Sequence, residues 1–226
     1  FCTIPTIYPR LKYRPVDHLI TTFEQGMRLD PREKAVLYAP SFVHPQRKEL
    51  LQYFVDKKMP FSVPSLRLEY LDDELLALIR KAGQRSLTVA PEANERIRIL
   101  TDKKIADQDF FRMFGQAKQQ GFTQIKMYFI IGLPDQTEKD LREMLQFIKE
   151  AKQRFGRRIY ASINPLVPKP KTPYADVPFA KDKLRAQILF LNNHMDIKMK
   201  MNTLKNAELE WKLAFARDFD FMPLLR

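Results

Sequence analysis

The sequence has few of the residues that mark secreted, membrane-spanning or zinc-binding proteins. It contains one cysteine, Cys2, so no disulfide can form within the chain. A reducing, cytoplasmic compartment is therefore the default expectation. No run approaches the ~18 consecutive apolar residues typical of a transmembrane helix, and residues 1–10 lack the pattern of a signal peptide. The three histidines, His18, His44 and His194, are scattered without the spacing of zinc ligands.

Two common nucleotide-binding signatures are also absent. No G-x-G-x-x-G follows an early expected strand, and no G-x-x-x-x-G-K-[ST] occurs anywhere. These absences exclude the standard dinucleotide-binding fingerprint and the standard P-loop. The sequence also shows no adjacent pairing of a nucleophile with a base. A function must therefore be sought in the residues that follow the expected strands.

Positive charge is in surplus, with 39 Lys and Arg against 27 Asp and Glu and a formal net charge of +12. Such a surplus favours polyanionic partners, among them RNA, DNA and phosphorylated metabolites. The basic residues are spread along the chain rather than clustered. The ordinary solubility of a basic domain therefore explains the charge about equally well.

Short apolar strands alternate with amphipathic helices along the chain. The expected strands are 34–39, 61–69, 86–90, 124–131, 158–166 and 197–201. The expected helices are 16–27, 45–55, 72–83, 95–100, 107–119, 137–148, 181–193 and 207–216. This alternation predicts an α/β fold with a parallel sheet. We expect a partial (β/α)6-type TIM-like barrel over 1–178, and a small C-terminal αβ appendage over 179–226.

The stretch QIKMYFIIGLPDQTEKDL, residues 124–141, joins an apolar strand to a helix through Gly-Leu-Pro. In a barrel the active face lies at the carboxyl ends of the strands, so this break is expected beside the ligand. The apolar strand predicts burial on both faces, with Tyr128 and Phe129 in the core. Thr137 with Asp140 three residues on predicts a structure close to a capping box.

Five stretches, taken in order, resemble enzymes of the radical S-adenosylmethionine (SAM) superfamily. Within it, the resemblance is to tRNA methylthiotransferases, the elongator catalytic subunit and cobalamin-dependent relatives. The stretches are SLRLEYLDDELLALIRKAG (65–83), SLTVAPEANERIR (86–98), GFTQIKMYFIIGLPDQTEKDL (121–141), ASINPLVPKPKTPY (161–174) and ELEWKLAFARDFDF (208–221). Asp135 stands where the family usually has Gly, and FARD stands where it usually has Ser-Arg-Gly-Asp. The resemblance covers nearly the whole chain.

The resemblance also interprets Cys2. The family holds a [4Fe–4S] cluster with three thiolates from C-x-x-x-C-x-x-C, and Phe1-Cys2 resembles the end of this motif. The first barrel strand and two cysteines would then precede residue 1, so the sequence would be truncated at the third cysteine. The alternative for Cys2 is a lone buried thiol. The resemblance further implies an electron donor such as flavodoxin or ferredoxin.

Two charged residues have both a family role and an ordinary one. The resemblance places Glu92 at the ribose or the amino-acid end of SAM, where a carboxylate accepts hydrogen bonds. Glu92 would otherwise support the dipole of the helix over 94–100. Arg67 would clamp a carboxylate of the cofactor, or it would pair with Glu69 or Asp72.

Four further residues complete the expected SAM site. Ser41 lies where the family has a methionine-binding Gly-Gly-Glu turn, from which YAPSF departs. Gly132 and Leu133 would contact adenine, although Gly-Leu-Pro also occurs as plain loop chemistry. Val167 lies in the stretch 161–174, which resembles the sixth-strand segment of the family, and is the last expected cofactor contact.

The function implied by the resemblance is a radical SAM enzyme that forms a 5′-deoxyadenosyl radical and abstracts hydrogen from the substrate. A bound cobalamin would instead favour methyl transfer. The substrate would be a tRNA or another phosphorylated molecule. Lys169 and Lys171 would hold a substrate phosphate, or they would form a solvated basic loop.

Two other functions stay open at this point. The chain would be a catalytically inactive barrel that serves as an RNA- or protein-binding scaffold, if no cluster motif precedes Phe1. Alternatively, an iron-independent barrel would act on a phosphorylated metabolite. That function needs a base at a strand end, and only Glu69 and Glu92 offer one.

Overall fold

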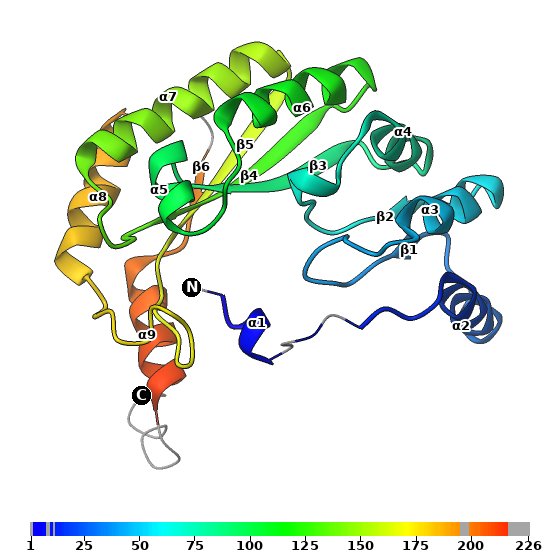
Figure 1. Cartoon of the computed structure of the whole chain (residues 1–226), viewed down its shortest axis with the longest axis horizontal. Coiled ribbons are helices and arrows are strands. Elements are labelled where there is room, and N and C mark those ends of the chain that lie inside the picture. Colours follow the sequence, from blue (N-terminus) through cyan, green and yellow to red (C-terminus); the bar gives the residue numbers. More distant parts are fainter. Residues whose placement is uncertain (1, 8–9, 11, 195–198, 217–226) are drawn as a thin grey trace.

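Two parallel sheets form the framework of this protein. The computed structural model describes residues 2–7, 10, 12–194 and 199–216 (Figure 1). The larger sheet has the order β3-β4-β5-β6, with β3 at Ser86–Glu92, β4 at Gln124–Ile131, β5 at Arg158–Pro165 and β6 at Met199–Met201. In the smaller sheet, β1 (Ala35–Val36) pairs with β2 (Phe61–Ser62). All these pairings are parallel, so the predicted α/β class is confirmed.

Helices return the chain from one strand to the next. They are α3 (Arg47–Asp56), α4 (Asp73–Lys81), α6 (Asp107–Gln119), α7 (Glu138–Phe155) and α8 (Lys181–His194), with the shorter α5 (Glu95–Leu100) and η1 (Leu68–Tyr70) between them. In Figure 1, α6 and α7 cover one face of the larger sheet, which we call the outer face. The helices α1 (Ile4–Ile7), α2 (Val16–Leu29) and α9 (Leu204–Phe215) lie away from that face.

The main core lies under the outer face. On β4 every second residue, namely Ile125, Met127, Phe129 and Ile131, is 0% exposed. Side chains alternate between the faces of a strand, so these residues all meet the helical layer. The Phe129 ring centroid lies 6.2 Å from that of Phe147 on α7, in an edge-on arrangement that aromatic rings favour. The residues on this face of β4 therefore stabilise the fold.

The opposite, inner face of β4 is only partly buried, and the prediction of burial on both faces is wrong. Gln124, Lys126, Tyr128 and Ile130 all retain partial exposure. Helices cover one face of the sheet, whereas the other face borders the interior of the partial barrel. The core position expected for Phe129 is confirmed, and that expected for Tyr128 is wrong.

The strand boundaries also differ from the prediction. The expected strands 34–39 and 61–69 shorten to β1 and β2, which pair at two positions only. Pro64, two positions after β2, cannot donate to a sheet. Conversely, β3 continues through Pro91 to Glu92, with a register shift between Val89 and Glu92. The capping box at the start of α7 is confirmed, since Thr137 and Asp140 cap each other's backbone N–H.

The C-terminal segment adds a strand to the larger sheet. β6 pairs with β5 alone in the described structure, as expected of an edge strand. The division at residue 178 stays a prediction, and this pairing crosses it. Residues 197–198 of the expected strand and 217–221 of the last family-like stretch lie outside the described residues.

Candidate active site

A cleft of about 470 Å³ opens at the carboxyl ends of β3, β4 and β5. Cys2, Glu92, Tyr128, Asn164 and Val167 are among the residues that line it. The structure therefore brings three of the predicted site residues together, although they lie far apart in the sequence. It also adds Tyr128 and Asn164, for which the sequence predicted no role in the site.

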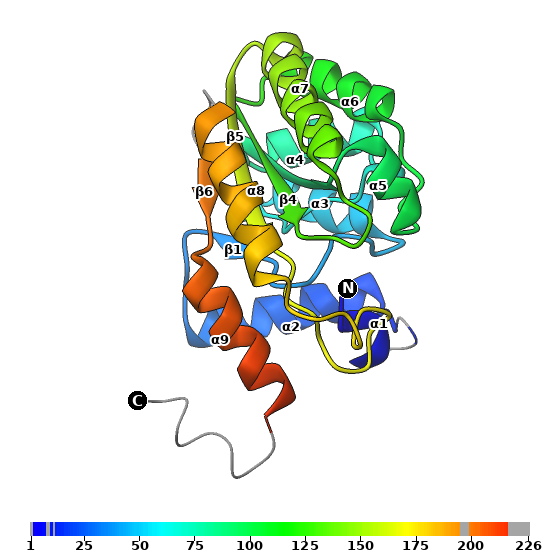
Figure 2. The ribbon, with the colours of Figure 1, turned by 90° about the vertical axis from the view of Figure 1, so that its left-hand side faces the viewer.

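Cys2 is exposed, so its interpretation as a lone buried thiol is wrong. Its sulfur accepts a hydrogen bond from the backbone N–H of Ile4 at 3.4 Å. The Thr6 hydroxyl donates to the Lys171 carbonyl at 2.7 Å, which ties the N-terminal segment to the loop between β5 and α8. Figure 2 shows α1 beside this loop. No group of three His, Cys, Asp or Glu side chains that could hold a metal occurs among the described residues.

Glu92 ends β3 in an unusual conformation. Its φ of 67° lies in the left-handed region, which is strained for a residue with a Cβ. Its side chain is 15% exposed and forms an ion pair of 3.3 Å with Lys103. Burial raises the pKa of the Glu92 carboxyl, while Lys103 opposes that shift. A strained, desolvated acid in a cleft is a candidate functional group.

Arg98 holds the end of β3 in place, although no motif in the sequence predicts this role. The guanidinium is 0% exposed and donates to the carbonyls of Pro91 at 2.9 Å and Ala93 at 3.0 Å. These two carbonyls flank Glu92. Arg98 also pairs with Asp107 at 2.9 Å, and burial raises the pKa of that acid. Its only signal in the sequence was a charged residue within the apolar stretch of a short helix.

The Gly132 loop packs against α8. The φ of Gly132 is +82°, and a Cβ at this position would lie 2.5 Å from Leu184 Cδ2. Its N–H donates to the side-chain oxygens of Gln136 at 2.9 Å and Gln187 at 2.7 Å. Leu133 is 0% exposed, in a small apolar cluster. Neither residue is among those that line the cleft, and their contact with adenine stays a prediction.

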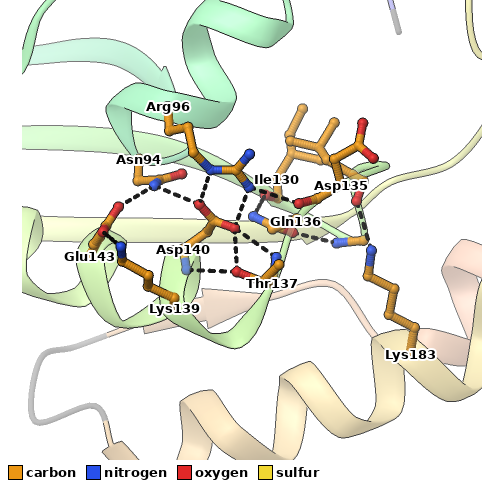
Figure 3. A network of polar contacts seen from close by, with 12 residues as sticks. Asn94, Arg96, Ile130, Asp135, Gln136, Thr137, Lys139, Asp140, Glu143 and Lys183 are labelled. Atoms are coloured by element: carbon orange, nitrogen blue, oxygen red, sulfur yellow. Dashed lines mark hydrogen bonds and ion pairs between the residues drawn. The ribbon is translucent and has the colours of Figure 1, made fainter.

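A polar network fixes the same loop on its other side (Figure 3). Asp140 accepts hydrogen bonds from Arg96 at 2.8 Å and from Asn94 at 2.9 Å. Arg96 also donates to the Asp135 carbonyl at 2.8 Å, and Lys183 donates to the Leu133 carbonyl at 2.9 Å. The bond from Arg96 holds the pKa of Asp140 far below its ordinary value. The network joins α5, α7 and α8 around the loop.

Arg67 pairs with Glu69 at 2.8 Å, as one of its two interpretations anticipated. Asp72 is occupied elsewhere, because it pairs with Lys48 at 2.8 Å and caps α4. Ser41 donates to a backbone carbonyl of the neighbouring loop at 3.4 Å. Neither Arg67 nor Ser41 lines the cleft, so the structure does not bring them to Glu92.

The two lysines of the PKPKTP loop have different surroundings. Lys169 lines the cleft but forms a 2.6 Å ion pair with Glu210 of α9. Lys171 is exposed, with a φ of 59°.

Within the described structure, no helix combines the length and hydrophobicity needed to cross a membrane.

Comparisons with known proteins agree with this arrangement. The family model for the radical SAM superfamily matches residues 1–148. An uncharacterized protein of Methanocaldococcus jannaschii is 32% identical over 176 residues, which are 77% of this chain and 39% of that protein. The chain therefore spans well under half of this relative.

Two solved structures share the fold. Coproporphyrinogen III oxidase (HemN) from Escherichia coli, described as a radical SAM enzyme, has a TM-score of 0.59 at 18% identity, over 81% of this chain and 48% of that one. SuiB of Streptococcus suis, bound to S-adenosylmethionine, has a TM-score of 0.55 at 11% identity, over 94% of this chain and 48% of that one. These similarities confirm the predicted α/β fold with parallel sheets of the partial-barrel kind.

Proposed function

Since the chain belongs to the radical SAM superfamily, we propose that the cleft at its strand ends binds SAM beside an iron–sulfur cluster. The observation that carries this proposal is the convergence of Cys2 and Glu92 on one cleft. The two residues come from segments about ninety positions apart, and only the fold unites them. The volume of about 470 Å³ is within the range of pockets that hold small molecules and cofactors.

The side chains of the cleft suit the chemistry of SAM. Glu92 offers a carboxylate to hydroxyl or ammonium groups, and Asn164 offers an amide that both donates and accepts. Ile130, Leu166 and Val167 also line the cleft and offer apolar surface to the rest of the ligand. Arg98 positions Glu92 through the two carbonyls beside it.

Cys2 is the one residue of the chain that suits an iron–sulfur cluster. An exposed thiol at the cleft is accessible to iron, which takes thiolate ligands. Because the sequence contains a single cysteine, a three-cysteine cluster needs two thiolates from outside the 226 residues. When bound, the cluster and SAM would supply a 5′-deoxyadenosyl radical that abstracts hydrogen from the substrate.

The remaining contribution of the chain is to enclose the cleft. Residues of the N-terminal segment, the loop between β5 and α8, and α9 all line it. The Thr6–Lys171 hydrogen bond and the Lys169–Glu210 ion pair hold these segments to one another. Enclosure limits the access of water to a reactive intermediate.

The finer parts of the function stay predictions. They are the relation to methylthiotransferases and the elongator subunit, a bound cobalamin with methyl transfer, a tRNA or other phosphorylated substrate, a flavodoxin or ferredoxin as electron donor, and a cytoplasmic location. The catalytically inactive scaffold is the second candidate. It would be favoured if no C-x-x-x-C motif precedes Phe1 in the full-length protein.

Anaerobic analysis of iron and sulfide in the full-length protein, after cluster reconstitution, tests the proposal. We expect about four irons per chain, lost in Cys2→Ala, and SAM binding that weakens in Glu92→Gln. A substitution of the exposed Lys152 on the outer helix α7 serves as control and should keep both properties. A folded full-length protein that retains no iron would overturn the enzyme proposal and leave a binding scaffold.

A further inference from the structure

A set of basic and hydroxyl side chains lies on the inner face of the larger sheet. In the strand register, Lys126 pairs with Tyr160, Tyr128 pairs with Ser162, and Ser162 pairs with Lys200. Directly paired residues of neighbouring parallel strands project from the same face. We call these five residues the inner patch. It spans β4, β5 and β6, and of its five residues only Tyr128 also lines the cleft.

The lysine of β4 lies close to two tyrosine rings. Lys126 Nζ lies 4.6 Å from the ring centroid of Tyr128 and 5.9 Å from that of Tyr160. A cation over an aromatic face is attracted by the electron density of the ring. Lys126 and both tyrosines are partly buried, and Ser162 is 5% exposed. The ammonium therefore has a defined place on the inner face.

The positive charge of the inner patch is not neutralised by the acids around it. Among the described residues, neither Lys126 nor Lys200 forms an ion pair. The two acids that line the cleft, Glu92 and Glu210, are each paired with another lysine. Lys200 is exposed, whereas Lys126 is partly buried. Partial desolvation of the Lys126 charge costs free energy, and a bound anion would offset that cost.

The inner patch is continuous with the cleft. Tyr128 belongs to both, and Lys126 precedes it by two residues on β4. At the rise of a strand, this places Lys126 about 7 Å further from the carboxyl end of the sheet. A ligand that enters beside Glu92 and extends along β4 would reach the ammonium.

We propose that the inner patch binds an anionic group of the substrate, a phosphate or a carboxylate, with Lys126 as its main contact. Lys126 and Lys200 supply charge, and the hydroxyls of Ser162 and the tyrosines supply further donors. The inference rests on the proposed use of the cleft as the active site. It restricts the substrate to molecules that carry negative charge at a distance from the atom that reacts.

Ligand-observed NMR titrations of the full-length protein with phenyl phosphate, benzoate and neutral benzyl alcohol test the inner patch. The ionic strength is fixed near ~0.15 M, which screens weak surface binding. We expect at least one of the anions to bind more tightly than the alcohol. Lys126→Met should weaken that binding about tenfold, the scale of one lost charge-assisted hydrogen bond. Lys126→Arg should retain most of it, and Lys152→Met on the outer helix should leave it unchanged.

Two results would overturn the inference. One is equal binding of the anions to wild type and Lys126→Met, and the other is complete displacement of phenyl phosphate by SAM. The second would assign the patch to the carboxylate of SAM. The titration needs no cluster, so its outcome is separate from the iron analysis. If Lys126→Met does not fold, as judged by thermal melting, Tyr160→Phe and Ser162→Ala take its place, and unchanged binding in both would count against the patch.

Discussion

On β4, Met127 and Phe129 contact the helical layer and are 0% exposed, whereas Lys126 and Tyr128 on the other face are partly exposed. These four successive residues therefore face two different environments in alternation. The outer face excludes water and stabilises the fold, and the inner face keeps polar groups available beside the cleft. The pleat of one strand is enough to separate stability from binding.

The strand ends show a similar contrast. Glu92 and Gly132 both have positive φ: Glu92 is the last residue of β3, and Gly132 comes directly after β4. Glu92 keeps its carboxylate at the cleft. Gly132 instead lies under Leu184, where a side chain would not fit. The same backbone conformation therefore presents a functional group in one case and allows close packing in the other.

The largest expected effect separates the two faces of β4. Phe129→Ala should lower the free energy of unfolding by about 3–5 kcal/mol, since it leaves a cavity beside Phe147. Tyr128→Ala should cost less than half as much, because the ring is already partly exposed. Urea unfolding of both variants measures the difference. Similar losses at the two positions would contradict the division of the strand into a stabilising and a binding face.

The next effect concerns the Gly132 loop. Gly132→Ala should lower the free energy of unfolding by roughly 1–3 kcal/mol, since the new Cβ meets Leu184 at a positive φ. Gly115 on α6 is the matched control, because a Cβ there would have no atom within 4 Å. Gly115→Ala should raise stability by up to about 1 kcal/mol. If both variants lost stability equally in urea unfolding, packing against α8 would not be the reason for Gly132.

A smaller effect depends on pH. Asp140 has a lowered pKa because of its bond to Arg96, so its charged form stabilises the folded state above the unfolded pKa. Asp140→Asn should cost about 1–2 kcal/mol near pH 7, the scale of a lost cap and a charged hydrogen bond. The difference should shrink as the pH falls below about 4. Urea midpoints measured from pH 2.5 to 7 test this, and a constant difference would oppose it.

The smallest effect has the opposite sign. Burial raises the pKa of Glu92, so its contribution to stability is largest at low pH and decreases as the pH rises past its ordinary value of 4.5. Glu92→Gln should remove this decrease and change stability by less than about 1 kcal/mol. Because the protonated carboxyl and the amide are both neutral, the urea midpoints of the two proteins should be similar near pH 4 and should separate as the pH rises towards 8, with Glu92→Gln the more stable. Parallel curves would show that burial does not govern this carboxyl.

Local patterns in the sequence predicted the order of the elements well. The alternation of strands and helices gave the parallel α/β fold, and Thr137 with Asp140 gave the start of α7. These features depend on residues close together in the chain. The extent of β1 and β2 was overestimated, because pairing with neighbours decides where such short strands end.

The inner face and the strand ends could not be predicted in the same way. Gly132 and Gln187 are 55 positions apart, so no local pattern can predict the hydrogen bond between them. The partial exposure of Tyr128 depends on which face of β4 the helices cover, and its residue type is equally compatible with a core. The family resemblance implied that Cys2 and Glu92 belong to one site. Only the folded structure shows that both residues line the same cleft.

Arg98 connects the two environments that β4 separates. Its guanidinium carbon lies 4.8 Å from the ring centroid of Phe110 and 5.6 Å from that of Phe147, while its N–H groups bind carbonyls on either side of Glu92. Loosening of the aromatic layer would release this side chain and, with it, the conformation of Glu92. The cleft should consequently lose its shape at the same temperature at which the core melts, so that ligand affinity would be maintained up to the unfolding transition and then vanish abruptly.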